Sequence, residues 1–290
     1  MPKEITHWIA AERIKDLIRQ GRVREAINRY PDFYYLGAVV YDSPFYAYGV
    51  RNVEQFGEIV GKLHGTDHGD TFEPFRAFFT SFPSNPPDEA LSFISGAFTH
   101  YSMDVIFHPF VNYFSGKYAS DDPAKRTDSQ TRHRTFEGLM DIYFSGVHAA
   151  ELGAESACRL GSGLQNGGRF SQTLQGLANN REMTNEVVSR FFGIDTQRIP
   201  IWPLLERHGL IQRQLFRRML SAALNLAGAV AGGPLAVIAA TFYPAIRSQA
   251  LREPAKALQF FAAPITGTHP NTGEALRGTA DDFAARATIG

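Results

Sequence analysis

Three side chains able to bind a metal ion recur every four residues within residues 96–114, GAFTHYSMDVIFHPFVNYF. They are His100, Asp104 and His108, and most of the residues between them are apolar. Residues four apart lie on the same face of an α-helix, so this spacing predicts a stripe of imidazole and carboxylate groups. Burying such groups is unfavourable unless they are paired or bound to a metal ion. The pattern therefore indicates a metal site built on a helix.

His100 and His108 are too far apart on a regular helix to bind the same ion. Their separation along the helix axis is about 12 Å at about 1.5 Å per residue, whereas zinc holds its ligands at about 2.0–2.2 Å. The two histidines therefore predict two ions, with Asp104 between them. Pro109 disfavours helical geometry at the residue before it, so we expect a break that turns His108 toward its own metal.

A second pair of a histidine and a carboxylate follows at His133 and Glu137, again four residues apart. Such a pair is common on the solvent face of a helix and stabilises it only slightly. Coming after the first pair, it supports a metal centre. His64 follows a predicted amphipathic helix at residues 52–63 and is a further candidate ligand. His68, in the glycine-containing turn beyond it, is interpreted as a loop residue.

Asp42 follows an apolar run and precedes Pro44, where the predicted helix ends. An acid at this position could cap the next turn. It could also project from the helix end into a cavity, as a metal ligand or a general base. His7, beside Trp8 in a predicted N-terminal helix, is interpreted from its local sequence alone as a structural residue.

These side chains fall on segments whose apolar residues have helical spacing, which predicts an all-α fold. We expect a multi-helix bundle with the metal cluster in its helical core. Residues 1–155 would form a metal-binding catalytic core, and residues 156–290 a helical C-terminal part packed on the same domain. The polar segment 115–130 predicts a loop, and residues 270–287 a turn and a short helix. The main predicted helices cover residues 5–20, 23–30 and 52–63, a long stretch after Pro87, and a stretch beginning near residue 131.

Residues 219–246 carry no charged side chain and are numerous enough to cross a bilayer. Gly232, Gly233 and Pro234 divide the segment into two shorter halves, and Asn225 adds a polar group. A buried helical hairpin is the interpretation we favour over membrane insertion. Peripheral contact with a membrane stays open.

The composition is that of an ordinary globular protein. The 290 residues have a formal net charge of zero and are 44% hydrophobic, so the charge balance disfavours nucleic acid as a partner. The 23 phenylalanines and 11 tyrosines suit a bulky helical core. A single cysteine excludes an intrachain disulfide. The N-terminal segment lacks the apolar stretch of a signal peptide, and we expect a cytoplasmic protein.

Five fragments occur in an order that resembles the zinc-dependent phospholipase C family, all-helical zinc phosphodiesterases related to P1/S1 nucleases. The fragments are THWIAAERI, VVYDSPFY, LHGTDHGDTFEPF, FISGAFTHYSMDVIFHPF and RHRTFEGLMD, and they span about the first 140 residues. Each fragment is weakly specific by itself. Together and in this order they are specific.

The resemblance implies two or three Zn²⁺ ions. One zinc would be held by Asp42, His64, His100 and Asp104. Another would be held by His108, His133 and Glu137. In the family a third zinc uses the N-terminal histidine, here His7, together with a bridging carboxylate and the N-terminal amine. His7 stands only a few residues after Met1, which departs from the family pattern and leaves the third ion open.

The implied activity is a phospholipase C-like phosphodiester hydrolase, in which zinc-bound hydroxide attacks the phosphorus of a phospholipid or a related phosphodiester. Asp42 would position or deprotonate the water. Imidazole and carboxylate ligands are typical of catalytic zinc, whereas structural zinc more often uses cysteine. The sequence contains neither the serine-hydrolase motif GxSxG nor the zinc-protease motif HExxH.

Two alternatives differ in the chemistry that they require. A P1-type nuclease or nucleotidase would need aromatic and basic groups beside the metals. A non-catalytic, metal-stabilised helical binding protein would fill every coordination position with protein ligands.

Overall fold

The computed structural model describes most of the first half of the chain and parts of the second. The described residues are 4–47, 50, 53–65, 69–116, 120–134, 137, 140–141, 168–195, 201–224, 265–268 and 275–278. His68 and residues 225–246 of the predicted apolar hairpin lie outside this set.

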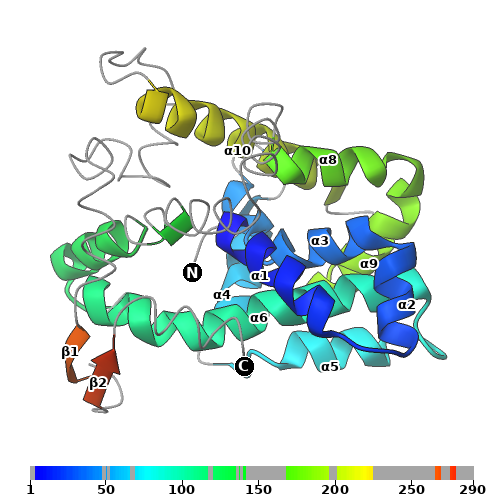
Figure 1. The fold of residues 1–290 in the computed structure, drawn as a ribbon, viewed down its shortest axis with the longest axis horizontal. Helices are drawn as coiled ribbons and strands as arrows, with labels where there is room; N and C mark the ends of the chain where they lie inside the picture. Colours follow the sequence, from blue (N-terminus) through cyan, green and yellow to red (C-terminus); the bar gives the residue numbers. More distant parts are fainter. Residues whose placement is uncertain are drawn as a thin grey trace. The chain divides into compact units, whose positions relative to one another are not determined.

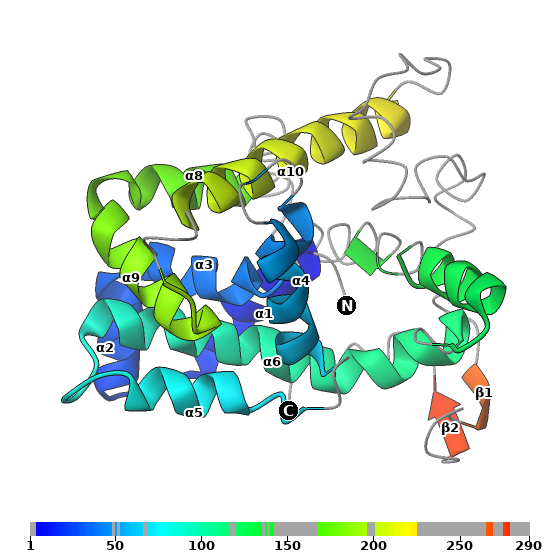
Figure 2. The ribbon, with the colours of Figure 1, turned by 180° about the vertical axis from the view of Figure 1, so that it is seen from behind.

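Apart from one two-stranded ribbon, every described regular element is a helix (Figures 1 and 2), and the predicted all-α class is confirmed. The elements are α1 (Glu4–Leu17), α2 (Arg22–Arg29), α3 (Pro31–Val40), the 3₁₀ turn η1 (Ser43–Tyr46), α4 (Val53–His64), α5 (Glu73–Thr80), α6 (Asp88–Ser115), α8 (Gly168–Gly176), the 3₁₀ turn η2 (Ala178–Asn180), α9 (Arg181–Phe192), α10 (Ile201–Leu224), β1 (Ile265–Thr268) and β2 (Ala275–Gly278).

The chain divides into two compact units. The first contains Met1–Arg13, Tyr101–Gln165 and Gln214–Gly290, and the second contains Ile14–His100 and Asn166–Arg213. Helix α6 is continuous from one into the other. The predicted boundary near residue 155 stays a prediction.

The core of the second unit is aromatic. The rings of Phe75, Phe93 and Phe191 are buried, and Phe191 lies 5.6 Å from each of the other two, centroid to centroid. Tyr41 continues this cluster, with its ring 5.3 Å from Phe191 and stacked on His100 at 4.7 Å. The phenylalanine-rich composition therefore builds a core that leads directly to one of the candidate ligands.

Helix α6 differs from the sequence prediction at Pro109. The sequence predicts a break near His108, but the helix continues to Ser115. Proline removes one backbone hydrogen bond and crowds the preceding turn, and these costs do not end this helix.

The predicted loop over residues 115–130 is also wrong in part, because residues 123–134 are helical. The Asp122 carboxylate accepts hydrogen bonds from the backbone N–H groups of Ala124 and Lys125, at 2.9 and 3.3 Å. With Pro123 in the first turn, this is the usual chemistry of a helix N-terminus.

The predicted turn and short helix over residues 270–287 are wrong at Ala275–Gly278, which form strand β2, and the rest of that range lies outside the described residues. Strand β1 pairs antiparallel with β2, with Ile265 opposite Gly278 and Thr268 opposite Ala275. Two of the four residues of β1 are threonine and one is isoleucine, and such β-branched side chains favour strands. Among the described residues, no helix is both long and apolar enough to cross a bilayer.

Candidate metal centre

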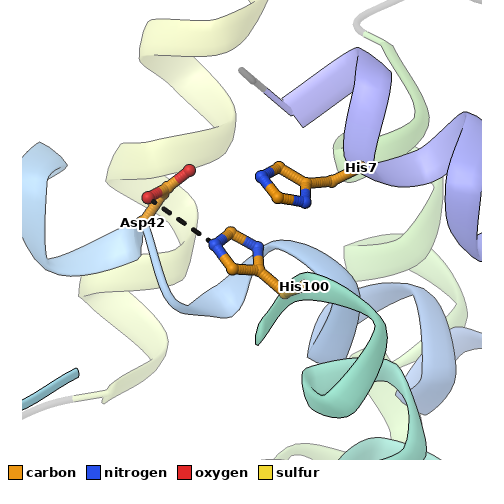
Figure 3. A group of neighbouring side chains, drawn as sticks. All are labelled: His7, Asp42 and His100. Atoms are coloured by element: carbon orange, nitrogen blue, oxygen red, sulfur yellow. Dashed lines mark ion pairs between the residues drawn. The ribbon is translucent and has the colours of Figure 1, made fainter. Parts of the chain in front are cut away.

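Asp42, His64 and His100 come together in the second unit. The Asp42 Oδ1 atom lies 3.5 Å from His64 Nε2 and 4.0 Å from His100 Nε2. A ligand atom of His64 also lies within 4.8 Å of one on His100. Figure 3 shows the Asp42 carboxylate directed toward the His100 ring, with a dashed line between them. Helix ends supply two of the three residues, because Asp42 follows α3 and His64 ends α4.

The two histidines present the same nitrogen to Asp42 for the same reason. His100 Nδ1 lies 2.8 Å from the Ala38 carbonyl oxygen, and His64 Nδ1 lies 3.1 Å from that of Val60. A carbonyl oxygen only accepts hydrogen bonds, so Nδ1 carries the proton in both rings. In the neutral ring the Nε2 lone pair then points toward Asp42. Metal-ligating histidines commonly use this arrangement, in which a backbone carbonyl fixes the tautomer.

The separations between these atoms fit ligands that share an ion. Direct charge-assisted hydrogen bonds between nitrogen and oxygen measure about 2.7–2.9 Å, which is shorter than either distance to Asp42 Oδ1. Two ligands of one tetrahedral zinc lie about 3.3 Å apart, given bonds of about 2.0–2.1 Å. The nitrogen and oxygen donors of Asp42, His64 and His100 therefore suit zinc in both type and spacing.

Aromatic side chains surround this group. Tyr41 stacks on His100 and meets the His64 ring edge-on at 5.8 Å, while Phe45 lies 5.3 Å from His64. His100 is fully buried and Asp42 is 5% exposed. Low polarity around charged ligands strengthens their attraction for a cation.

A second group lies in the first unit, where His7 Nε2 of α1 is 3.5 Å from Asp104 Oδ1 of α6. His7 and Asp104 are both buried. Asp104 stands one helical turn after His100 on α6, so one face of that helix carries a ligand of each group. Helical geometry alone therefore makes Asp104 a neighbour of His100.

Asp141 holds the start of the helix that carries His7. Its carboxylate accepts hydrogen bonds from the backbone N–H groups of Ile5 and Thr6, at 3.3 and 3.0 Å, and from the Thr6 hydroxyl at 2.6 Å. Burial raises the pKa of Asp141 to about 7, and the hydrogen bonds from Thr6 oppose this shift. Asp141 is not among the ligands predicted from the sequence, although it continues the four-residue spacing from His133 through Glu137.

His133 and Glu137 form a direct pair in the first unit, with Nε2 2.7 Å from Oε1. Both are buried, unlike the solvent-facing pair that such spacing usually produces. The His108 and His133 rings are 5.8 Å apart, and His133 Nδ1 lies 3.4 Å from Ser115 Oγ. The structure thus brings His108 close to this pair without a break in α6.

Comparison with protein families matches residues 6–177 to the family described as zinc dependent phospholipase C, more than half of the chain. The chain belongs to this family. The match confirms the resemblance found in the sequence, and the matched range contains all the candidate ligands from His7 to Glu137. No curated protein and no solved structure gave a match in the corresponding comparisons.

Membership of the zinc-dependent phospholipase C family supports a phospholipase C-like hydrolase in general terms, and the family's name indicates zinc dependence. The described residues offer imidazole and carboxylate groups that could hold such ions. The histidine and carboxylate composition agrees with that of catalytic zinc sites.

Proposed function

We propose that the protein is a zinc-dependent phosphodiester hydrolase that acts on a phospholipid. The observation that carries the proposal is the common orientation of His64 and His100, whose Nδ1 atoms are held by backbone carbonyls while their Nε2 atoms approach Asp42 Oδ1. Two histidines with a purely structural role would not need to direct their Nε2 atoms at the same carboxylate. Family membership supplies the phospholipid as substrate class.

Two sets of ligands would hold separate ions. Asp42, His64, His100 and Asp104 would bind one zinc, and His108, His133 and Glu137 another. His7 beside Asp104 would serve a third ion if one is bound. The close pair of His133 and Glu137 would open as the ion enters between its atoms, because 2.7 Å is a hydrogen-bond distance.

Zinc bound by these residues would neutralise the phosphodiester charge and make a bound water more acidic. The Asp42 carboxylate would orient that water and accept its proton. The water oxygen forms a bond to phosphorus as the bond from phosphorus to the leaving alkoxide breaks. The leaving alkoxide would take up the proton that Asp42 accepted, so the products would be a diacylglycerol and a phosphorylated head group.

The test measures metal content and hydrolysis together. Purified wild type, Asp104→Asn and Asp42→Asn are analysed for zinc per chain and assayed on phospholipid vesicles and on a chromogenic phosphodiester. Asp128→Asn is the control. Asp128 is exposed, and its carboxylate forms an ion pair with Arg132 four residues later on the same helix. We expect at least two zinc ions in wild type and in the control, and fewer in the two site variants, with activity falling in parallel.

Each other outcome selects another function. One zinc or none, without turnover, would overturn the proposal and favour a metal-stabilised binding protein. Turnover of a nucleotide phosphodiester but not of phospholipid would favour the nuclease reading.

Contact with the membrane through residues 219–246 belongs to the same proposal. The absence of charged side chains from this segment supports it. Deleting the segment should abolish binding to phospholipid vesicles and spare hydrolysis of a soluble phosphodiester. Vesicle binding that survives the deletion would refute this part alone.

A further inference from the structure

The turn that follows Asp42 is held by a histidine far away in the sequence. Element η1 has only four residues, and isolated 3₁₀ turns are weakly stable. His208 of α10 contacts this turn twice. Its Nδ1 atom lies 2.9 Å from Ser43 Oγ, and its ring stacks on Tyr46 at 4.1 Å between centroids.

His208 is itself fixed on its other side. The ring is fully buried, lies 4.3 Å from the Phe170 ring, and has its Nε2 atom 3.0 Å from Gln212 Nε2. An amide nitrogen only donates hydrogen bonds, so in this arrangement Nε2 of His208 accepts. The proton of the neutral ring is then on Nδ1, which donates to Ser43 Oγ.

Ser43 is directly bonded to Asp42, whose backbone is fixed on both sides. The Asp42 N–H donates to the Val39 carbonyl at 3.2 Å, and the Asp42 carbonyl accepts from Phe45 N–H at 3.0 Å. With these two bonds in place, the direction of the Asp42 carboxylate depends on where η1 sits. The contact of Ser43 with His208 helps to hold that position within the second unit, together with the packing of η1 against α3 and α4.

We propose that His208, oriented by Gln212, is a positioning residue that aims the Asp42 carboxylate at its metal ion through Ser43. The inference rests on the proposed function, because it assumes that Asp42 is a zinc ligand. It extends the site to α10, which contributes none of the candidate ligands. Removing residues that orient a metal ligand typically changes metal affinity by about 10- to 100-fold.

Paired serine variants separate positioning from stability. Ser43→Ala and Ser92→Ala each remove a fully buried hydroxyl with one hydrogen bond, since Ser92 Oγ donates to the Tyr30 carbonyl at 2.8 Å. Zinc affinity is measured by competition with a chromophoric chelator, and folding by urea denaturation of the zinc-stripped proteins. We expect similar losses of stability, with zinc affinity about 10- to 100-fold weaker only in Ser43→Ala.

A second comparison tests the histidine. His208→Asn can keep an N–H group near the position of Nδ1, whereas His208→Ala cannot. We expect the asparagine variant to recover most of the zinc affinity that the alanine variant loses. The visible spectrum of the cobalt-substituted protein should change in Ser43→Ala and His208→Ala, and match wild type in Ser92→Ala.

Zinc affinity of Ser43→Ala equal to that of Ser92→Ala would overturn the inference while leaving zinc binding by wild type intact. If His208→Ala fails to fold, Ser43→Ala alone decides. Wild type that binds no zinc would overturn the proposed function first, and this inference with it.

Discussion

Gly37 of α3 and Gly96 of α6 each lie against the backbone of the other's helix. A β-carbon at Gly37 would collide with the Phe93 carbonyl and lie 2.9 Å from the Ala97 nitrogen. One at Gly96 would collide with the Tyr34 carbonyl. The two glycines therefore allow a helix–helix approach that any larger residue would prevent.

This close approach has a direct consequence for the candidate metal centre. His100 stands one turn after Gly96, and its Nδ1 atom reaches the Ala38 carbonyl next to Gly37 at 2.8 Å. Asp42 follows the end of the same helix α3. The distance between α3 and α6 thus sets both the tautomer of His100 and its separation from Asp42.

The first prediction is that Gly96→Ala weakens zinc binding as well as folding. The added methyl group must push α6 away from α3, which breaks the bond from His100 to Ala38. We expect a loss of about 3 kcal/mol or more in the free energy of unfolding, at the upper end of overpacking costs. Urea denaturation and chelator competition measure the two effects.

Gly57→Ala is the matched control, because Gly57 is also helical but a β-carbon there meets nothing within 4 Å. Alanine should stabilise α4 by about 0.5–1 kcal/mol and leave zinc affinity unchanged. Wild-type zinc affinity in Gly96→Ala would show that the helix contact does not set the site.

The second prediction concerns removal of the metal. In the proposed function zinc binds the folded chain. Adding zinc to the stripped protein should then raise the free energy of unfolding, by about 2.7 kcal/mol at a free concentration 100 times the dissociation constant. Thermal unfolding with and without a chelator measures this difference. In Asp42→Asn the difference should shrink markedly. Equal chelator effects in the two proteins would remove Asp42 from the ligand set.

The regular spacing of polar residues made part of this site predictable. The spacing of apolar residues predicts the helix itself. Residues His100 and Asp104, four apart, then share one face of the helix whatever it packs against. The grouping of Asp42 with His64 could not come from spacing, because the two residues belong to different elements. It came from the resemblance, and the structure brings their side chains within 3.5 Å.

The remaining features depend on contacts that no local pattern records. His208 meets Ser43 across 165 positions, and Asp141 meets Thr6 across 135. The break expected at Pro109 did not occur, because a local preference of the preceding residue is small beside the packing of a long helix. The helix that begins at residue 123 was missed although Asp122 and Pro123 are common at helix starts.

The third prediction separates the ions. Glu137→Gln removes a carboxylate from the pair with His133 but leaves Asp42, His64 and His100 unchanged. We expect zinc per chain to fall by one ion while an ion remains bound, and hydrolysis to fall at least about 100-fold, because paired metals stabilise both the attacking and the leaving oxygen. Elemental analysis after gel filtration gives the count. Unchanged stoichiometry would contradict a separate ion at this pair.

The fourth prediction follows from the buried carboxyl of Asp141. Its pKa is about 7 in the folded protein and 3.8 as the ordinary value, so the folded state holds a proton between these pH values that the unfolded state has released. Its contribution to stability is therefore full below about pH 4 and is lost as the pH rises to about 7. The Asp141→Asn variant has no carboxyl group at this position, so its stability should not show this fall with pH.

Urea denaturation of zinc-stripped wild type and Asp141→Asn, at pH 5 and pH 8, isolates this effect from other titrating groups. The stability of wild type relative to the variant should fall by roughly 2 to 4 kcal/mol between the two pH values. The asparagine oxygen can still accept one of the bonds from Ile5 and Thr6, which keeps the variant folded. A difference that stays constant with pH would mean that hydrogen bonds from the start of α1 offset burial and keep Asp141 ionised.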